Sequence, residues 1–193
     1  MRPFINDNEV SLLAKACLPE RDEVAYRNIR ISPESVALMD KTIIDNTNSD
    51  VKENDTLYIL GDFAFVKTHE QAKAYRDRIN CKNVILIWGN HDNRELLKGL
   101  FQGYYDLLDI NVKGQKITLT HYAMWTWDCS HRSSWNLFGH SHNMIHSLSG
   151  TFSCDVGVDA WDYHPVSFEQ LKLFMSEKDI NGPKGYFEVK GEK

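Results

Sequence analysis

The sequence lacks the marks of a membrane-embedded or exported protein. It has no apolar run near the ~20 residues that a transmembrane helix needs, and its first residues, MRPFINDNEV, carry acidic side chains where a signal peptide is apolar. Its cysteines are scattered without a CxxC pair, which disfavours both a zinc ribbon and a disulfide framework. We therefore expect a cytoplasmic protein with no membrane partner and with four free thiols, at Cys17, Cys81, Cys129 and Cys154.

An excess of positive charge is also absent. The chain has 22 basic and 27 acidic residues, a formal net charge of -5, and no evident basic stripe. Tight binding of nucleic acid requires basic groups that neutralise phosphates, so we expect no stable nucleic-acid partner. With 193 residues, 42% of them hydrophobic, the chain can bury a substantial core. We predict one domain over residues 1–180 and a glycine-containing tail over residues 181–193.

Helical and strand patterns alternate along the chain. Ser32-Pro33-Glu34 provides an N-cap, a proline at the first helical position and an early acid, which predicts a helix ending near residues 46–48. The apolar runs at 57–60 and 84–88 predict buried strands. Further strands are predicted on both sides of Lys113-Gly114-Gln115, before Gly139 and within 151–161, and further helices at 69–79, 94–101 and 167–177.

Four of these strands end in a polar residue that can bind metal: Asp62, Asn90, His121 and His140. In sheets covered by helices, loops from different strands converge where the strands end. We therefore expect one site assembled from distant segments. Carboxylate, amide and imidazole ligands together suit divalent manganese, iron, zinc or nickel.

The motifs around these residues resemble a known family. GDF (61–63), GNHD (89–92), THY (120–122) and GHSH (139–142), in that order, resemble the calcineurin-like metallophosphoesterase superfamily. Four ordered motifs are far more specific than one. Segments 121–142 and 155–171 also resemble small phosphoesterases of bacteria and their phages. The resemblance implies an α/β fold, a two-sheet β-sandwich flanked by α-helices, and a hydrolase with two divalent metal ions, manganese first among the candidates.

The resemblance also implies a role for each motif residue. Asp62 would bridge the two metals. His91 would contact the phosphate or the leaving group without binding metal, and Asp92 would orient it, although Asp92 could instead cap the following helix. The remaining implied ligands are Asn90, His121 and His140 for the second metal and His142 for the first.

The amino-terminal segment departs from the family pattern. The family normally has Asp-x-His after its first strand, with both residues on the first metal. Here the best candidate is FINDNE, in which Asp7 matches the aspartate and Glu9 stands in place of the histidine. Glu9 either ligates through oxygen, which favours a harder ion such as manganese, or disables the first site.

Other polar and aromatic residues near the motifs have two readings. His131 and Arg132 are candidates for binding a substrate phosphate, against a solvated loop. Asp155 and Asp159 are candidate acceptors for histidine N–H groups, against turn capping. The tryptophans at 125, 127, 135 and 161 fit core packing better than a rim on which a nucleobase stacks.

These observations favour a phosphoesterase in which metal-bound hydroxide attacks phosphorus and His91 assists departure of the leaving group. The family's habits give a mild preference for phosphodiester substrates, including small nucleotides. The main alternative is a catalytically impaired relative that serves as a binding or regulatory module, because Glu9 replaces the expected histidine. A nuclease acting on polymers also fits the chemistry, but the net charge disfavours it.

Overall fold

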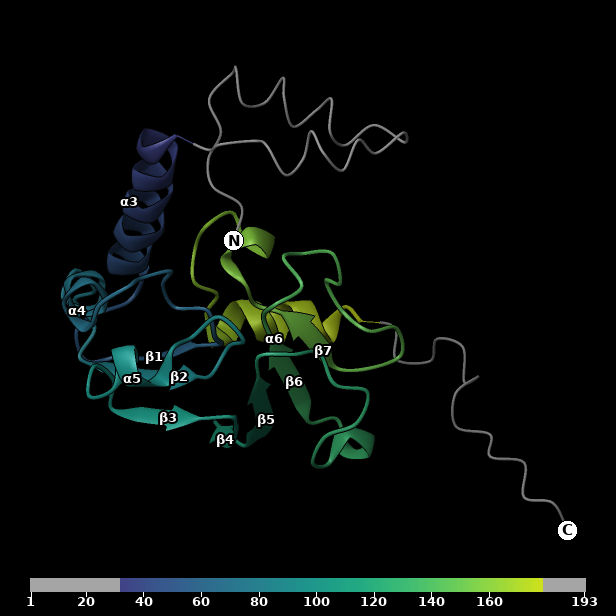
Figure 1. Cartoon of the computed structure of the whole chain (residues 1–193). Helices are drawn as coiled ribbons and strands as arrows, with labels where there is room; N and C mark the ends of the chain where they lie inside the picture. The colour runs from purple at the N-terminus through teal and green to yellow at the C-terminus, as the bar shows by residue number, and fades with distance from the viewer. Residues whose placement is uncertain (1–31, 179–193) are drawn as a thin grey trace, which may run out of the picture.

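The computed structural model describes residues 32–178, which form two β-sheets with helices on their outer sides (Figure 1). Within this range no helix has both the length and the apolar character that crossing a membrane requires. The helices are α3 (Pro33–Asp50), α4 (His69–Arg76), α5 (Arg94–Leu97) and α6 (Phe168–Ser176), with 3-10 turns η1 (Ser130–Arg132) and η2 (Val158–Ala160). The strands are β1 (Thr56–Ile59), β2 (Asn83–Ile87), β3 (Gly103–Tyr105), β4 (Leu107–Val112), β5 (Gln115–Thr120), β6 (Trp135–Phe138) and β7 (Ser153–Asp155).

The first sheet is parallel and has the order β1-β2-β3. Side chains alternate across β2, as they do in any strand. Val84 and Leu86 pack with Ala72 of α4 and Leu97 of α5, whereas Ile87 faces the second sheet. Because β1 and β2 run in the same direction, the loops that follow them leave from the same edge.

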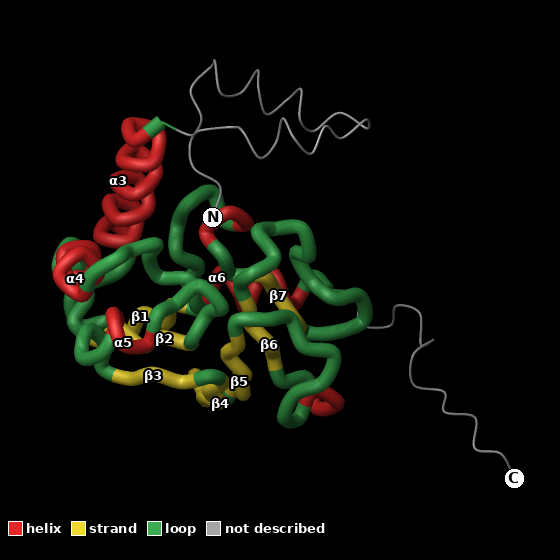
Figure 2. Tube along the Cα trace, viewed as in Figure 1, coloured by secondary structure: helices red, strands yellow, loops and turns green. Residues whose placement is uncertain are grey.

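The second sheet has the order β4-β5-β6-β7. β4 and β5 form an antiparallel hairpin around Lys113 and Gly114, whose φ values of 51° and 89° suit a two-residue turn. β5, β6 and β7 are parallel to one another. The loops after β5 and β6 therefore also share an edge, and Figure 2 shows how much of the chain between β6 and β7 is loop.

The main core lies between the two sheets and α6. Leu60 and Ile87 from the first sheet pack with Leu119 and Leu137 from the second and with Leu171 of α6. These buried apolar side chains provide the main driving force for closing one sheet onto the other. The closure holds the loops of both sheets in one place.

Two helices begin at the serines that their sequences predict. The Ser32 hydroxyl accepts a hydrogen bond from the Ser35 backbone N–H at the start of α3. Ser167 and Gln170 form a reciprocal capping box at the start of α6. Such caps satisfy backbone donors that a helix start leaves unpaired.

The predicted fold class, two sheets flanked by helices, is confirmed, and the main errors concern short elements. The predicted helix at 94–101 ends at Leu97, and Gly99 follows with a left-handed φ of 80°. β3 was not predicted because three residues are too few to show a periodicity. The helix that starts at Pro33 continues to Asp50. The predicted domain limits at 1, 180 and 193 lie outside the described residues.

Candidate metal centre

The ends of four strands meet at one place, where the two sheets face each other. Asp62 and Asn90 follow β1 and β2, and His121 and His140 follow β5 and β6. A hydrogen bond joins the two halves: His121 Nδ1 lies 2.7 Å from the backbone carbonyl oxygen of Leu60. His121 of the second sheet is thus hydrogen-bonded to the segment of the first sheet that leads to Asp62.

Three side chains in this region can share a metal ion. Asp62, His121 and His140 each offer one ligand atom, and these atoms all lie within 4.8 Å of one another. His121 Nε2 is 3.6 Å from Asp62 Oδ2 and 2.9 Å from Asn90 Oδ1. His121 is buried, and Asp62 is only 18% exposed. The structure thus brings together the four residues predicted to converge: Asp62, Asn90, His121 and His140.

The hydrogen bonding of His121 suits a cation. A carbonyl oxygen can only accept a hydrogen bond, so the neutral His121 ring carries its proton on Nδ1 and leaves a lone pair on Nε2. That lone pair faces the oxygens of Asn90 and Asp62. His121 Nε2, Asn90 Oδ1 and Asp62 Oδ2 are all electron-rich, and a cation between them would stabilise this arrangement. A backbone carbonyl that fixes the tautomer is also usual for a histidine that binds metal.

The same loops contain residues with a strained backbone. Asp62, His140, His142 and Asn143 all have left-handed φ values, of 55°, 60°, 46° and 60°. Residues with side chains rarely adopt this conformation, and such strain is common where a site must be held in place. Three of the predicted ligands, Asp62, Asn90 and His140, directly follow a glycine, which leaves room for the turn.

Two glycines allow the loops to approach closely. A Cβ at Gly61 would lie 2.2 Å from His121 Nδ1, and a Cβ at Gly89 would lie 2.3 Å from both the backbone nitrogen and Oδ1 of Asp62. No side chain can stand that near to another atom. The glycines in the GDF and GNHD motifs are therefore required by contact between loops of different strands.

Asp92 binds backbone rather than His91. Its carboxylate accepts hydrogen bonds from the N–H groups of Asp62, Phe63 and Gly89, at 2.8–2.9 Å. It thereby ties the loop after β1 to the loop after β2. The role predicted for Asp92, to orient His91, finds no support in these contacts. The alternative role as a helix cap is wrong, because Asn93 is the N-cap of α5.

His140 and His142 differ in their surroundings. Burial and the neighbouring His121 ring lower the pKa of His140, which favours the neutral form that binds metal. His142 lies outside the close group, and its Nδ1 is 2.7 Å from Asp159 Oδ2. A carboxylate behind a histidine fixes the ring and leaves Nε2 for a ligand. Asp159 therefore has the geometry expected of a supporting residue.

Asp155, unlike Asp159, binds backbone N–H groups and not a histidine. It is fully buried in β7, and its carboxylate accepts hydrogen bonds from the N–H groups of Asn143 and Gly157. Burial raises the pKa of Asp155, while these two hydrogen bonds oppose the rise. Of its two predicted readings, the turn-capping one is confirmed.

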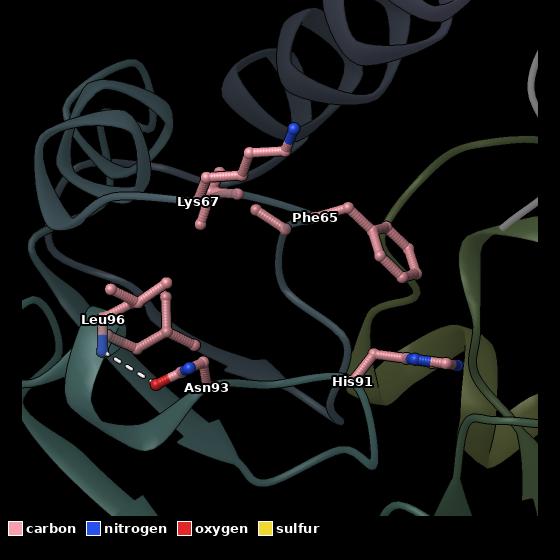
Figure 3. Close-up of a pocket in the computed structure, with 8 residues that line it drawn as sticks. Phe65, Lys67, His91, Asn93 and Leu96 are labelled. Atoms are coloured by element: carbon pink, nitrogen blue, oxygen red, sulfur yellow. Dashed lines mark hydrogen bonds between the residues drawn. The ribbon is translucent and has the colours of Figure 1, made fainter.

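His91 lies at the exposed side of the centre. Its backbone N–H donates to Asp62 Oδ1 at 2.9 Å, and its ring centroid lies 5.1 Å from that of Phe65. Both side chains project from adjacent loops toward the same side (Figure 3). A cavity of about 240 Å³ lies beside them, and its lining comprises Ala64, Phe65, Val66, Lys67, His91, Asn93, Leu96 and Leu97. Phe65 is not among the residues predicted from the sequence. The sequence shows it only as an apolar residue within a loop.

His131 and Arg132 lie at the other end of the second sheet. They form η1, which directly precedes β6, and the neighbouring Ser133 carbonyl accepts a hydrogen bond from Gln115 at the start of β5. The metal ligands follow the opposite ends of these strands. This placement does not support the predicted contact with a substrate phosphate. Asp7 and Glu9 lie outside the described residues.

The tryptophans mostly belong to the packed interior. Trp127 is buried and donates a hydrogen bond to the Ser134 carbonyl, and Trp135 stacks on Phe168 at 5.5 Å. Trp161 donates to the backbone carbonyl of Asp155. Trp125 is the exception, because it is 61% exposed. Core packing was therefore the better reading for three of the four.

A larger cavity of about 1320 Å³ starts at the metal residues and runs between the sheets. We name it the inter-sheet groove. Its lining includes Met39 and Ile44 of α3, Ile59 of β1 and Leu119 of β5, besides Asp62, His140 and His142. The groove is thus polar at the metal residues and largely apolar elsewhere.

Comparisons with known proteins agree with the fold. No family model matches the chain. It is 29% identical over 145 residues to an uncharacterized protein of Methanocaldococcus jannaschii, which covers 71% of this chain and 75% of that protein. It is similar in structure to a protein of unknown function from Aquifex aeolicus, with a TM-score of 0.57 and 21% identity over 89% of this chain and 94% of the other. A likeness to an archaeal phosphodiesterase (TM-score 0.46, 19% identity, 63% of this chain and 76% of the other) is too loose to establish a shared fold.

Proposed function

We propose that the chain is a metal-dependent phosphoesterase of the calcineurin-like metallophosphoesterase superfamily, acting on phosphodiesters. The observation that carries the proposal is the convergence of Asp62, His121 and His140, whose ligand atoms lie within 4.8 Å of one another. The four ordered motifs supply these residues and Asn90 after β1, β2, β5 and β6. Mixed carboxylate, amide and imidazole ligands suit manganese, iron, zinc or nickel.

Two divalent cations would be held by the residues that the motifs supply. Asp62 would bridge them, with Asn90, His121 and His140 on one ion and His142 on the other. When bound, such cations supply a nucleophile from water at neutral pH and neutralise the charge of the phosphoryl oxygens. The Leu60 carbonyl and Asp159 would keep His121 and His142 in the tautomer that leaves Nε2 unprotonated.

We include Asp7 and Glu9 in this centre because FINDNE resembles the family's first metal-binding motif, with Glu9 in place of the histidine. Calorimetric titration of manganese into the protein and a Glu9→His variant tests this proposal. Equal affinity and equal turnover in the two proteins would remove Glu9 from the centre.

His91 would act on the leaving group rather than on metal. Its backbone N–H donates to Asp62 Oδ1, and its side chain is exposed, so that the ring would be open to an ester bound at Asp62. When the phosphorus–oxygen bond breaks, the electron pair stays on the leaving oxygen, which takes a proton from the protonated ring. Positioned general acids of this kind contribute roughly 10²–10⁴-fold in rate.

Hydrolysis of chromogenic monoesters and diesters tests the proposed function. The protein is assayed with manganese, nickel, zinc and magnesium, each with a chelator control. We expect diester hydrolysis that the chelator abolishes. Metal binding without turnover across the panel would overturn the proposal and favour a binding or regulatory module.

The His91→Ala variant tests the assignment of the general acid. It should retain fold and metal affinity but lose roughly 10²-fold or more of kcat with a poor leaving group, and less with 4-nitrophenolate, which needs little protonation. The His131→Ala variant is the matched control. A loss that does not depend on the leaving group would refute the assignment.

A further inference from the structure

We infer that the cavity beside His91 is the subsite for the leaving group and that it selects an aromatic ring. This inference rests on the proposed function, because it names the kind of ester on which the proposed metal centre acts. Four features carry it: the exposure of Phe65, its contact with His91, the size of the cavity and the apolar character of the cavity walls.

The exposure of Phe65 is large for an aromatic side chain. Phe65 is 72% exposed, although a phenyl ring gains considerable free energy from burial. A single exposed apolar residue is ordinary on a protein surface. This ring, however, does not stand alone, because it packs at 5.1 Å against the His91 ring at a tilt of 51°.

The position of His91 determines which part of a substrate the cavity can receive. The proton donor must lie beside the oxygen that departs with the electron pair of the broken bond. The group attached to that oxygen therefore lies against the neighbours of His91. Those neighbours are Phe65 and the cavity, so the subsite receives the released alcohol rather than the phosphate that remains.

The size and walls of the cavity suit a flat ring. Its volume is about 240 Å³, and a cavity of roughly 150 Å³ is enough to hold benzene. Val66, Leu96 and Leu97 provide apolar walls. The Asn93 side-chain oxygen already accepts hydrogen bonds from the N–H groups of Glu95 and Leu96.

Figure 3 shows how these side chains are arranged around the cavity. Phe65 and Lys67 stand on one side and Asn93 and Leu96 on the other, and the side chains of Phe65 and His91 point to the same side. The Lys67 ammonium group points away from His91. Stacking on Phe65 is therefore the main attraction that the subsite offers, and it applies equally to an aryl group and to a nucleobase.

Two methyl phosphate diesters with leaving groups of similar acidity test the inference: one releases phenol and the other hexafluoroisopropanol. In the manganese-loaded protein, Phe65→Ala should lower kcat/KM roughly tenfold for the phenyl ester and less than threefold for the aliphatic ester. Tyr122→Ala is the matched control, because Tyr122 is also exposed and packs at 4.6 Å against His140 but does not line this cavity. It should affect both esters equally.

A binding measurement separates this inference from the proposed function. Phenol, adenosine and ribose are titrated into the metal-free protein, and the NMR signals of the His91 ring are followed. We expect ring-current shifts with an aromatic compound and none with ribose, and their loss in Phe65→Ala. Shifts with adenosine indicate a nucleobase, and shifts with phenol alone indicate a simple aryl group.

The possible failures are distinct. If the protein hydrolyses no diester, the proposed function fails, and the titration still decides whether the cavity binds aromatic rings. If diesters are hydrolysed but Phe65→Ala slows both esters equally, the inference is wrong and the proposed function stands. If no aromatic compound shifts the His91 signals, the inference is also wrong.

Discussion

The two ends of β5 and β6 carry histidines that are close in sequence but very different in setting. At the carboxyl ends, His121 is 3% exposed and hydrogen-bonded to Leu60 of the other sheet. At the amino end of β6, His131 is exposed in a short 3-10 turn. Only the first end faces Asp62.

Chain direction, not proximity in sequence, decides which polar residues can act together. β5 and β6 are parallel, so the connection between them must return along the whole sheet. Residues early in that connection stay at the metal end, and residues late in it reach the opposite end. His131 lies late in the connection, ten residues after His121.

Replacing each of these histidines by alanine gives the largest expected contrast. His121→Ala removes a ligand and should lower manganese affinity more than about a hundredfold, as measured by calorimetry. It also leaves the Leu60 carbonyl unpaired, which should lower the free energy of unfolding by about 1–3 kcal/mol. His131→Ala should change metal affinity less than about twofold and stability by less than ~0.5 kcal/mol.

Equal losses of metal affinity in the two histidine variants would mean that the metal does not bind at the carboxyl end of β5. A His121→Gln variant separates ligand loss from a folding defect, because it retains polar side-chain atoms near Leu60. If His121→Gln binds manganese as tightly as the wild type, His121 is not a ligand.

Two glycines provide a contrast of intermediate size. At Gly89→Ala the new Cβ would lie 2.3 Å from Asp62, so the two loops must separate. We expect a loss of about 1–3 kcal/mol in stability and at least roughly tenfold in metal affinity. At Gly114→Ala the Cβ would meet nothing within 4 Å, and only the positive φ is unfavourable. That variant should lose ~1 kcal/mol and no metal affinity.

Chemical denaturation and calorimetry measure both quantities in the glycine variants. A Gly89→Ala protein that binds metal normally would mean that the two loops can move apart without cost to the centre. The close approach of Gly89 to Asp62 would then contribute to packing but not to metal binding.

The smallest expected effect is a pH dependence from His140 in the metal-free protein. Because the pKa of His140 is lowered in the folded state, the unfolded chain binds more protons in the window between that lowered pKa and the usual pKa of about 6.5. The free energy of unfolding of the metal-free protein should therefore rise with pH through this window and fall on acidification. Thermal melts across pH 4–8 should show a weaker rise in His140→Gln than in the wild type. An unchanged pH profile would indicate that His140 titrates normally.

Much of the site could be predicted from the sequence, for a physical reason. A buried strand that ends in glycine and a polar residue is a local pattern, and it is visible at Asp62, Asn90 and His140. Parallel packing then brings such ends together. The convergence of these residues with His121 therefore follows from local patterns and strand direction.

The features that were missed depend on contacts between loops. Asp92 accepts hydrogen bonds from the N–H groups of Asp62, Phe63 and Gly89, and nothing in the sequence around Asp92 indicates those partners. The pairing of Phe65 with His91 is likewise a contact between two loops. The placement of His131 and Arg132 depends on the direction of β6, which the local sequence does not reveal.

The Asp92 carboxylate has a consequence for how the centre meets its ions. It holds the loops after β1 and β2 together through backbone N–H groups alone, so Asp62 and Asn90 are positioned by the fold itself. The loops therefore lose their conformational entropy when the chain folds. Binding of an ion does not have to order them again. By binding backbone N–H groups, the Asp92 carboxylate thus keeps the loops of Asp62 and Asn90 in place before any ion binds.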